Sequence, residues 1–253
     1  MKFKNLNFEK INKTINQILL YSAALSFYTI FALVPLILLI FTIFTSSPFF
    51  AEFYEKLQTF ILSNIIPTNQ EIAKHYINNF LQNSYKMGII GAFYLVITSI
   101  LFFDNYETII SKIFNEEKRD LFEKIKLYWT MITLFPLLFA GFVYVSVKIQ
   151  FFLNKFTNIH FIYIVPFLLI WLLFFLSYSL TIYKKKPKVT LIVSFFISII
   201  FLISKNIFIY YLLLNKTYTT IYGSVAILLF LFLWIYISWI IYITGLFIIK
   251  KFS

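Results

Sequence analysis

The chain of 253 residues contains no cysteine. Without thiols it holds no disulfide, thiolate zinc site, iron–sulfur cluster or cysteine nucleophile. Glycine is also scarce, and the five glycines form no phosphate-cradling motif. Charged residues make up 13% of the chain, about half of the roughly 25% found in an ordinary soluble domain. Because 61% of the residues are hydrophobic, this deficit of charge excludes both a soluble globular protein and a disordered chain.

Six apolar stretches are long enough to cross a bilayer as helices, which takes about 20 residues each. Backbone polar groups need partners within the segment in hydrocarbon, so these stretches are expected to be helices. The predicted fold class is all-α: a polytopic six-helix transmembrane bundle that forms one domain over residues 1–253. The first span is too long for a signal peptide and is expected to remain as an uncleaved anchor. The predicted spans cover residues 18–45, 87–110, 127–150, 161–183, 189–214 and 224–249.

Positive charge indicates the orientation of these spans. The chain has 22 cationic and 10 anionic residues, for a net charge of +12. The cations concentrate in the N-terminal segment, in the loops after spans two and four, and in the C-terminal tail. Lysine-rich loops stay in the cytoplasm, so both termini are expected there, with the basic loops facing anionic headgroups rather than nucleic acid. Only one cation is arginine, and we assign no function to this bias because the composition is typical of an AT-rich genome.

Two connections outside the bilayer carry helical patterns. The outer segment 46–86 predicts one helix that starts at Ser47 and a second that starts at Thr68, where the residues have the form of a capping box. These helices either lie on the membrane surface or pack on the bundle, or they form a lid over an outward-facing cavity. In the cytoplasmic loop 111–126, charges spaced i,i+4 predict a solvated helical extension rather than a metal site. The expected pairs are Lys112–Glu116, Arg119–Glu123 and Asp120–Lys124.

Ionisable residues inside spans are functional candidates by default. Lys205 and Asp104 are the strongest, and they differ in depth by about 15 Å, too far for a salt bridge. Glu107 ranks last because it lies near the hydrated cytoplasmic end. Lys205 either belongs to a functional site or extends toward the outer interface.

Small hydroxyl residues share faces of the first and fifth spans. They either mediate helix packing or line a polar inward-facing cavity with Asp104 at its mouth. Proline residues within spans are expected to kink them. The hydroxyl candidates are Ser22, Ser26, Ser194 and Ser198, and the prolines are Pro35, Pro136 and Pro166.

Several short motifs occur in the order found in the YihY/BrkB family of bacterial membrane proteins. The run from Ala23 to Tyr28 resembles the family's first span, and the stretch from Glu107 to Phe114 resembles the end of its second. The pattern Tyr-x-x-x-Pro at Tyr183 resembles a family turn. The chain departs from the family after the last glycine, where Leu246 and Phe247 replace Ala-Glu. The family-motif positions are Tyr28, Pro35, Tyr183, Pro187, Phe208, Tyr211, Tyr222, Gly223, Trp234 and Gly245.

The resemblance implies a multi-pass protein of the bacterial inner membrane. Family members are associated with envelope resistance, virulence and lipid or solute export, and the family has also carried a ribonuclease label. The leading hypothesis is a transporter or exporter-like protein for an envelope lipid or small solute. The alternative is a non-transporting envelope scaffold or resistance factor, and a homo-oligomer stays open in either case.

An enzyme is the least favoured class. The two histidines, His75 and His160, are expected on the outer side, away from cytoplasmic RNA, and neither has a metal-ligand partner at helical spacing. We therefore expect no catalytic, metal-binding or cofactor-binding residues and no cofactor.

Overall fold

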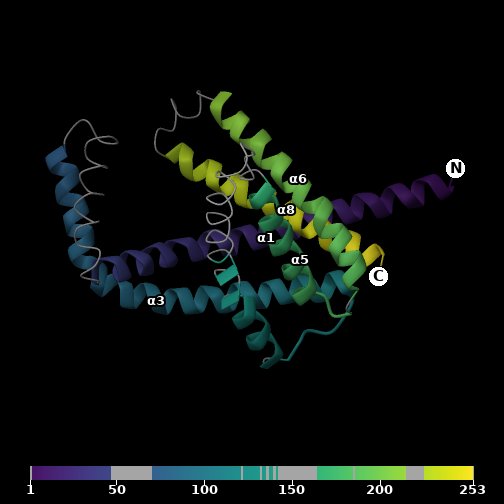
Figure 1. The fold of residues 1–253 in the computed structure, drawn as a ribbon, viewed down its shortest axis with the longest axis horizontal. Helices are drawn as coiled ribbons and strands as arrows, with labels where there is room; N and C mark the ends of the chain where they lie inside the picture. The colour runs from purple at the N-terminus through teal and green to yellow at the C-terminus, as the bar shows by residue number, and fades with distance from the viewer. Residues whose placement is uncertain are drawn as a thin grey trace, which may run out of the picture. The chain divides into compact units, whose positions relative to one another are not determined.

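The computed structural model describes residues 2–46, 70–120, 122–131, 164–184, 186–214 and 225–252, together with 133–134, 137–138 and 141. Its helices are α1 (Lys2–Ser46), α3 (Gln70–Phe114), α5 (Ile164–Thr181), α6 (Pro187–Leu214) and α8 (Val225–Lys251), shown in Figure 1. Residues 122–131 are helical too, and no strand occurs in the described ranges. The chain divides into two compact units, which we describe separately: residues 1–26 with 103–253, and residues 27–102.

Among the described residues, four helical stretches are long and apolar enough to cross a membrane. They are Glu9–Leu33, Ile90–Phe114, Pro187–Leu212 and Leu228–Lys251, and a shorter apolar helix covers Phe167–Thr181. This confirms the predicted class, an all-helical membrane bundle. The third predicted span, 127–150, falls largely outside the described residues, so the count of six spans stays a prediction.

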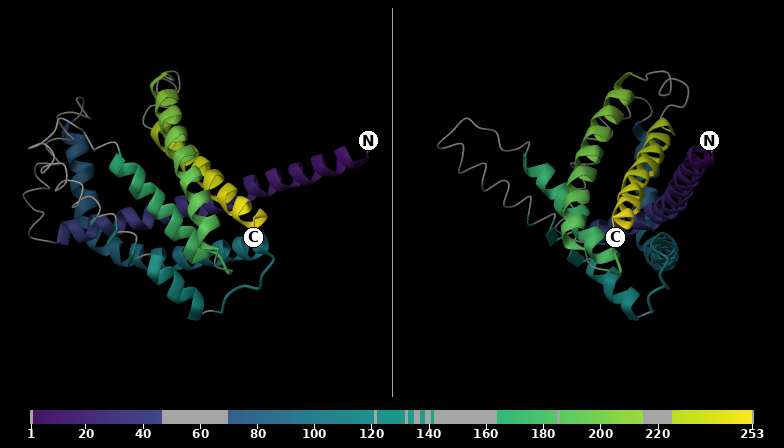
Figure 2. Two further views of the ribbon diagram at one scale, coloured as in Figure 1. Left: turned by 45° about the vertical axis from the view of Figure 1, so that its right-hand side comes forward. Right: turned by 90° about the vertical axis from the view of Figure 1, so that its right-hand side faces the viewer.

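In the first unit, α6 lies beside both α5 and α8 (Figure 2). Gly245 of α8 permits close helix contact, because a Cβ atom there would lie 2.7 Å from Cζ of Tyr178 and 3.1 Å from Cγ1 of Ile197. The rings of Tyr178 and Tyr242 stack with their centroids 4.9 Å apart. The fully buried core side chains of this unit include Leu25, Ile110, Ile113, Tyr178, Ile197, Ile243, Leu246 and Ile249.

The second unit consists of the later part of α1 and the earlier part of α3. Apolar side chains are exposed along both helices, including Phe27, Phe31, Phe93 and Ile100. Exposed apolar side chains in such numbers are expected where a helix faces lipid rather than water.

The outer segment differs from the prediction in one respect. The second outer helix and the second span are parts of one helix, because α3 runs from Gln70 to Phe114 without interruption. The predicted start of this helix at Thr68, and the whole first outer helix from Ser47, lie outside the described residues.

Two of the three prolines lie in described helices, and a kink at Pro35 stays a prediction. Pro35 lies inside α1, whose helical assignment continues through it. Pro166 lies in the first turn of α5, where a proline removes no helical hydrogen bond. Pro136 lies outside the described residues.

Gly245→Ala should destabilise the first unit by about 1–3 kcal/mol, because the added methyl group overlaps the Tyr178 ring. The free energy of unfolding in mixed detergent micelles measures the effect. Gly141→Ala is the matched control, since a Cβ atom at Gly141 meets nothing within 4 Å. Equal stability of the two variants would contradict the close contact at Gly245.

Candidate functional site

The chain turns back toward α3 immediately after this helix ends. Asn115 follows the last helical residue and has a positive φ of 54°, a left-handed conformation that asparagine tolerates better than most residues. The backbone N–H of Glu116 donates to the carbonyl oxygen of Ser111 at 3.1 Å, which closes the end of the helix. Residues 116–120 are not helical. We call residues 115–120 the strap.

The strap brings an arginine to a buried carboxylate. Glu107 is completely buried on α3. The backbone N–H of Arg119 donates to its Oε1 at 3.0 Å, and Nη1 of Arg119 donates to its Oε2 at 3.1 Å. Tyr128 donates to Oε2 at 2.8 Å and Tyr183 donates to Oε1 at 2.7 Å. Four donors from three chain segments therefore compensate the burial of this charge.

Arg119 makes two further contacts with other parts of its guanidinium group. Its guanidinium lies 4.2 Å from the centroid of the Tyr183 ring, a cation–π arrangement. Its Nη2 donates to the carbonyl oxygen of Thr181, the last residue of α5. These contacts use the planar, forked shape of the guanidinium. The side chain of Arg119 is only 11% exposed.

A chain of hydroxyl groups begins at the same end of α5. Oγ1 of Thr181 lies 2.7 Å from the Tyr106 hydroxyl, which lies 2.6 Å from that of Tyr242. Oγ of Ser177 lies 2.8 Å from the Tyr242 hydroxyl. The Tyr178 hydroxyl donates to the carbonyl oxygen of Tyr242 at 3.0 Å. A continuous polar path therefore leads from Glu107 and Arg119 into the apolar helices.

The other ion pairs near the strap each have at least one solvent-exposed partner. Lys184 lies 2.8 Å from Glu116, which raises the pKa of the Lys184 ammonium group through a hydrogen bond and charge attraction. Asp104 lies 3.2 Å from Lys124 and 3.6 Å from Lys118. Such pairs contribute little to stability, because water screens them.

Two predictions about this region were wrong. The helical extension expected over 111–126 is interrupted by the strap. Arg119 pairs with Glu107 rather than Glu123, because a buried carboxylate needs a partner more than an exposed one does. Glu107, ranked last, is the centre of the site. The sequence feature that could have pointed to the Glu107–Arg119 pair is that residue 119 is the single arginine of the chain.

Asp104 and Lys205, the two strongest sequence candidates, lie in different surroundings. The side chain of Asp104 is 58% exposed and pairs with Lys118 of the strap and with Lys124 of the helical residues 122–131. Lys205 is half-buried on α6, and it makes no ion pair within the described part of the chain. Their membership of a common site stays a prediction.

The four candidate serines are buried. Ser26, Ser194 and Ser198 each donate to a carbonyl oxygen of their own helix, at 2.6, 2.9 and 2.7 Å. Ser194 also accepts a hydrogen bond from the Trp171 indole at 3.2 Å. Ser22 Oγ is buried and has no hydrogen-bond partner among the described residues. These contacts are those expected of residues at helix contacts.

The motif positions have identifiable contacts. Tyr183 binds Glu107, Pro187 begins α6, and the rings of Phe208 and Trp234 stack at 5.2 Å. Leu246 is buried in the core, and the ring of Phe247 stacks on that of Tyr21 with their centroids 6.5 Å apart. Tyr222 and Gly223 lie outside the described residues.

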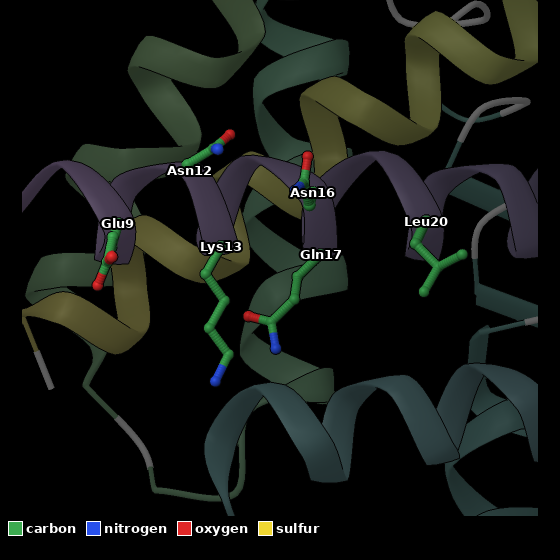
Figure 3. Close-up of a pocket in the computed structure, with 6 residues that line it drawn as sticks. All are labelled: Glu9, Asn12, Lys13, Asn16, Gln17 and Leu20. Carbon is green, nitrogen blue, oxygen red and sulfur yellow. The ribbon is translucent and has the colours of Figure 1, made fainter.

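An open concavity of about 390 Å³ follows one face of α1 (Figure 3). It includes none of the predicted site residues; its lining is Glu9, Asn12, Lys13, Asn16, Gln17 and Leu20. Within the described ranges, no group of three histidine, aspartate or glutamate side chains is arranged to hold a metal ion.

Apolar spanning helices around a buried ion pair define a helical integral membrane protein. The chain belongs to the BrkB family: residues 12–249 match the family described as "Virulence factor BrkB", which confirms the resemblance. A UPF0761 membrane protein of Haemophilus influenzae strain 86-028NP is 31% identical over 237 residues, covering 91% of this chain and 87% of that protein. One from Actinobacillus pleuropneumoniae serotype 5b is 32% identical over 239 residues, covering 91% and 87%. No solved structure matches the chain, and the names of these relatives indicate no enzymatic activity.

Arg119→Ala should lower the free energy of unfolding by about 3 kcal/mol or more, because it leaves the buried Glu107 charge without its cation. Lys118→Ala is the matched control on the same strap; its exposed pair should contribute less than about 1 kcal/mol. Chemical unfolding in mixed micelles measures both values. Equal losses of unfolding free energy in Arg119→Ala and Lys118→Ala would contradict a larger contribution from the buried Glu107–Arg119 pair.

Proposed function

We propose that this protein lies in the bacterial inner membrane with both termini in the cytoplasm, and moves an envelope lipid or a small solute across it. The observation that carries the proposal is the buried polar path of the first unit, from the Glu107–Arg119 pair through four hydroxyl groups to Ser177. The proposal assigns no catalytic role to these groups and no cofactor.

The cost of polar groups in hydrocarbon supports a transport role. Ionisable residues in spanning helices are rare, face the bundle interior and mark substrate or ion pathways. A bundle that only holds partners needs apolar contacts and small residues at its helix interfaces. A buried carboxylate and a guanidinium exceed what packing requires, whereas linked hydroxyls also occur at ordinary helix contacts. Lys205 and the four serines on α1 and α6 are proposed to extend this path.

The orientation is supported by where the lysines lie. Lys250 and Lys251 are in the last turn of α8, and Lys112 is in the last turn of α3. Lys184 and Lys186 lie between α5 and α6. These ends therefore belong on the cytoplasmic side by the positive-inside rule.

Transport predicts a change in cell chemistry. We expect mass spectrometry of total lipids and small metabolites to show at least one species that accumulates in cells lacking the protein. The wild-type chain should restore its level, whereas Lys205→Leu and Glu107→Gln should not, at equal amounts in the membrane. Lys188→Leu is the control, because Lys188 is an exposed lysine on the same helix as Lys205.

Identical profiles in all strains would reject transport. If the profiles differ but Lys205→Leu and Glu107→Gln restore them fully, the polar path carries nothing. In that case variants sensitive only in the outer segment 47–85 would favour the scaffold function instead.

The orientation has its own test, which the absence of native cysteine makes simple. A membrane-impermeant maleimide should label Lys186→Cys only in inverted vesicles. It should label Lys74→Cys, expected on the outer side, only in right-side-out vesicles. The reverse pattern would place both termini outside the cell.

A further inference from the structure

The strap covers the start of the hydroxyl chain. Arg119 donates to the carbonyl oxygen of Thr181, and Oγ1 of the same threonine is the first hydroxyl of the path toward Ser177. The residue that fixes the strap is therefore also bonded to the residue at which the polar path begins.

One buried interaction dominates the closed position of the strap. Residues 116–120 form no helix. The other two ion pairs of the strap are more exposed: the side-chain exposures are 79% and 33% for Lys184 and Glu116, and 43% and 58% for Lys118 and Asp104. Screening by water therefore leaves them weak. The Glu107–Arg119 pair is the buried one, with exposures of 0% and 11%.

The geometry points to a bistable segment. Asn115, at φ 54°, separates the regular helix of α3 from the strap and is the natural pivot. When the pair separates, Glu107 keeps the hydroxyl donors of Tyr128 and Tyr183, and Arg119 gains water at the membrane edge. The buried contacts that hold the strap all belong to Arg119, which binds Glu107, the carbonyl oxygen of Thr181 and the Tyr183 ring. A short non-helical segment fastened at one side chain can open locally while the helices around it stay folded.

We propose that the strap is a latch at the cytoplasmic end of the polar path, closed when Arg119 binds Glu107, and that transport requires it to open. This inference rests on the proposed transport function. It assigns Arg119 a positioning role: the guanidinium holds the strap and contacts no substrate in the closed state.

Spin labels can measure the opening directly, because the chain has no native cysteine. The test pair is Glu117→Cys on the strap with Lys188→Cys near the start of α6; both residues are exposed. The control pair is Lys112→Cys with Lys188→Cys. Lys112 lies on α3 before Asn115 and Lys188 lies on α6, so neither label is on the strap. Distances are recorded by double electron–electron resonance, with the full chain in nanodiscs of phosphatidylethanolamine and phosphatidylglycerol.

The test pair should give two distances, with the shorter one predominant. Arg119→Ala should raise the ratio of the longer to the shorter distance by at least about tenfold, because the buried pair is lost. Lys118→Ala, which removes only an exposed pair, should leave that ratio nearly unchanged. The control pair should give one distance in every variant.

A single short distance for the test pair in the wild-type strap would overturn the latch, whatever Arg119→Ala does. Equal shifts in Arg119→Ala and Lys118→Ala would also overturn it. A static strap would leave the transport proposal standing, since that proposal depends on the mass-spectrometric profiles. Unchanged profiles would reject transport even if the strap moves.

Discussion

A carboxylate buried on an apolar helix needs a cation and hydrogen-bond donors within the bundle. Glu107 imposes this requirement, and three segments answer it: the strap with Arg119, the helical residues 122–131 with Tyr128, and the turn after α5 with Tyr183. The direction of the chain after Phe114 follows from it. Asn115 takes a left-handed conformation, and the strap returns along α3 because its arginine has a partner there.

Helix packing determines where this network lies. Gly245 lets α8 approach Tyr178 of α5 closely, and this contact sets Tyr242 beside Ser177 and Thr181. The same packing fixes the end of α5, where Thr181 accepts from Arg119. The apolar core and the polar path are therefore parts of one arrangement, and a change in helix spacing would disturb the hydroxyl chain.

Two separate family stretches meet in this arrangement. Glu107 and Tyr183 lie 76 residues apart in the chain, and their side chains are 2.7 Å apart in the structure. Each stretch is a weak pattern in the sequence, and the hydrogen bond gives both a common physical reason. The two residues after Gly245 make apolar contacts of α8, since Leu246 is buried and Phe247 stacks on Tyr21.

The sequence by itself determined the helical class, the membrane setting and the family, because apolar run length and composition are local properties. Local residue spacing predicted the wrong ion-pair partner at the strap. The i,i+4 rule paired Arg119 with Glu123, yet its partner is Glu107, twelve residues earlier on a helix that the chain must reverse to reach. Only the tertiary structure decided which carboxylate is buried, and burial decides the pairing. Water solvates an exposed carboxylate, whereas a buried one must be compensated by a cation and hydrogen-bond donors of the protein.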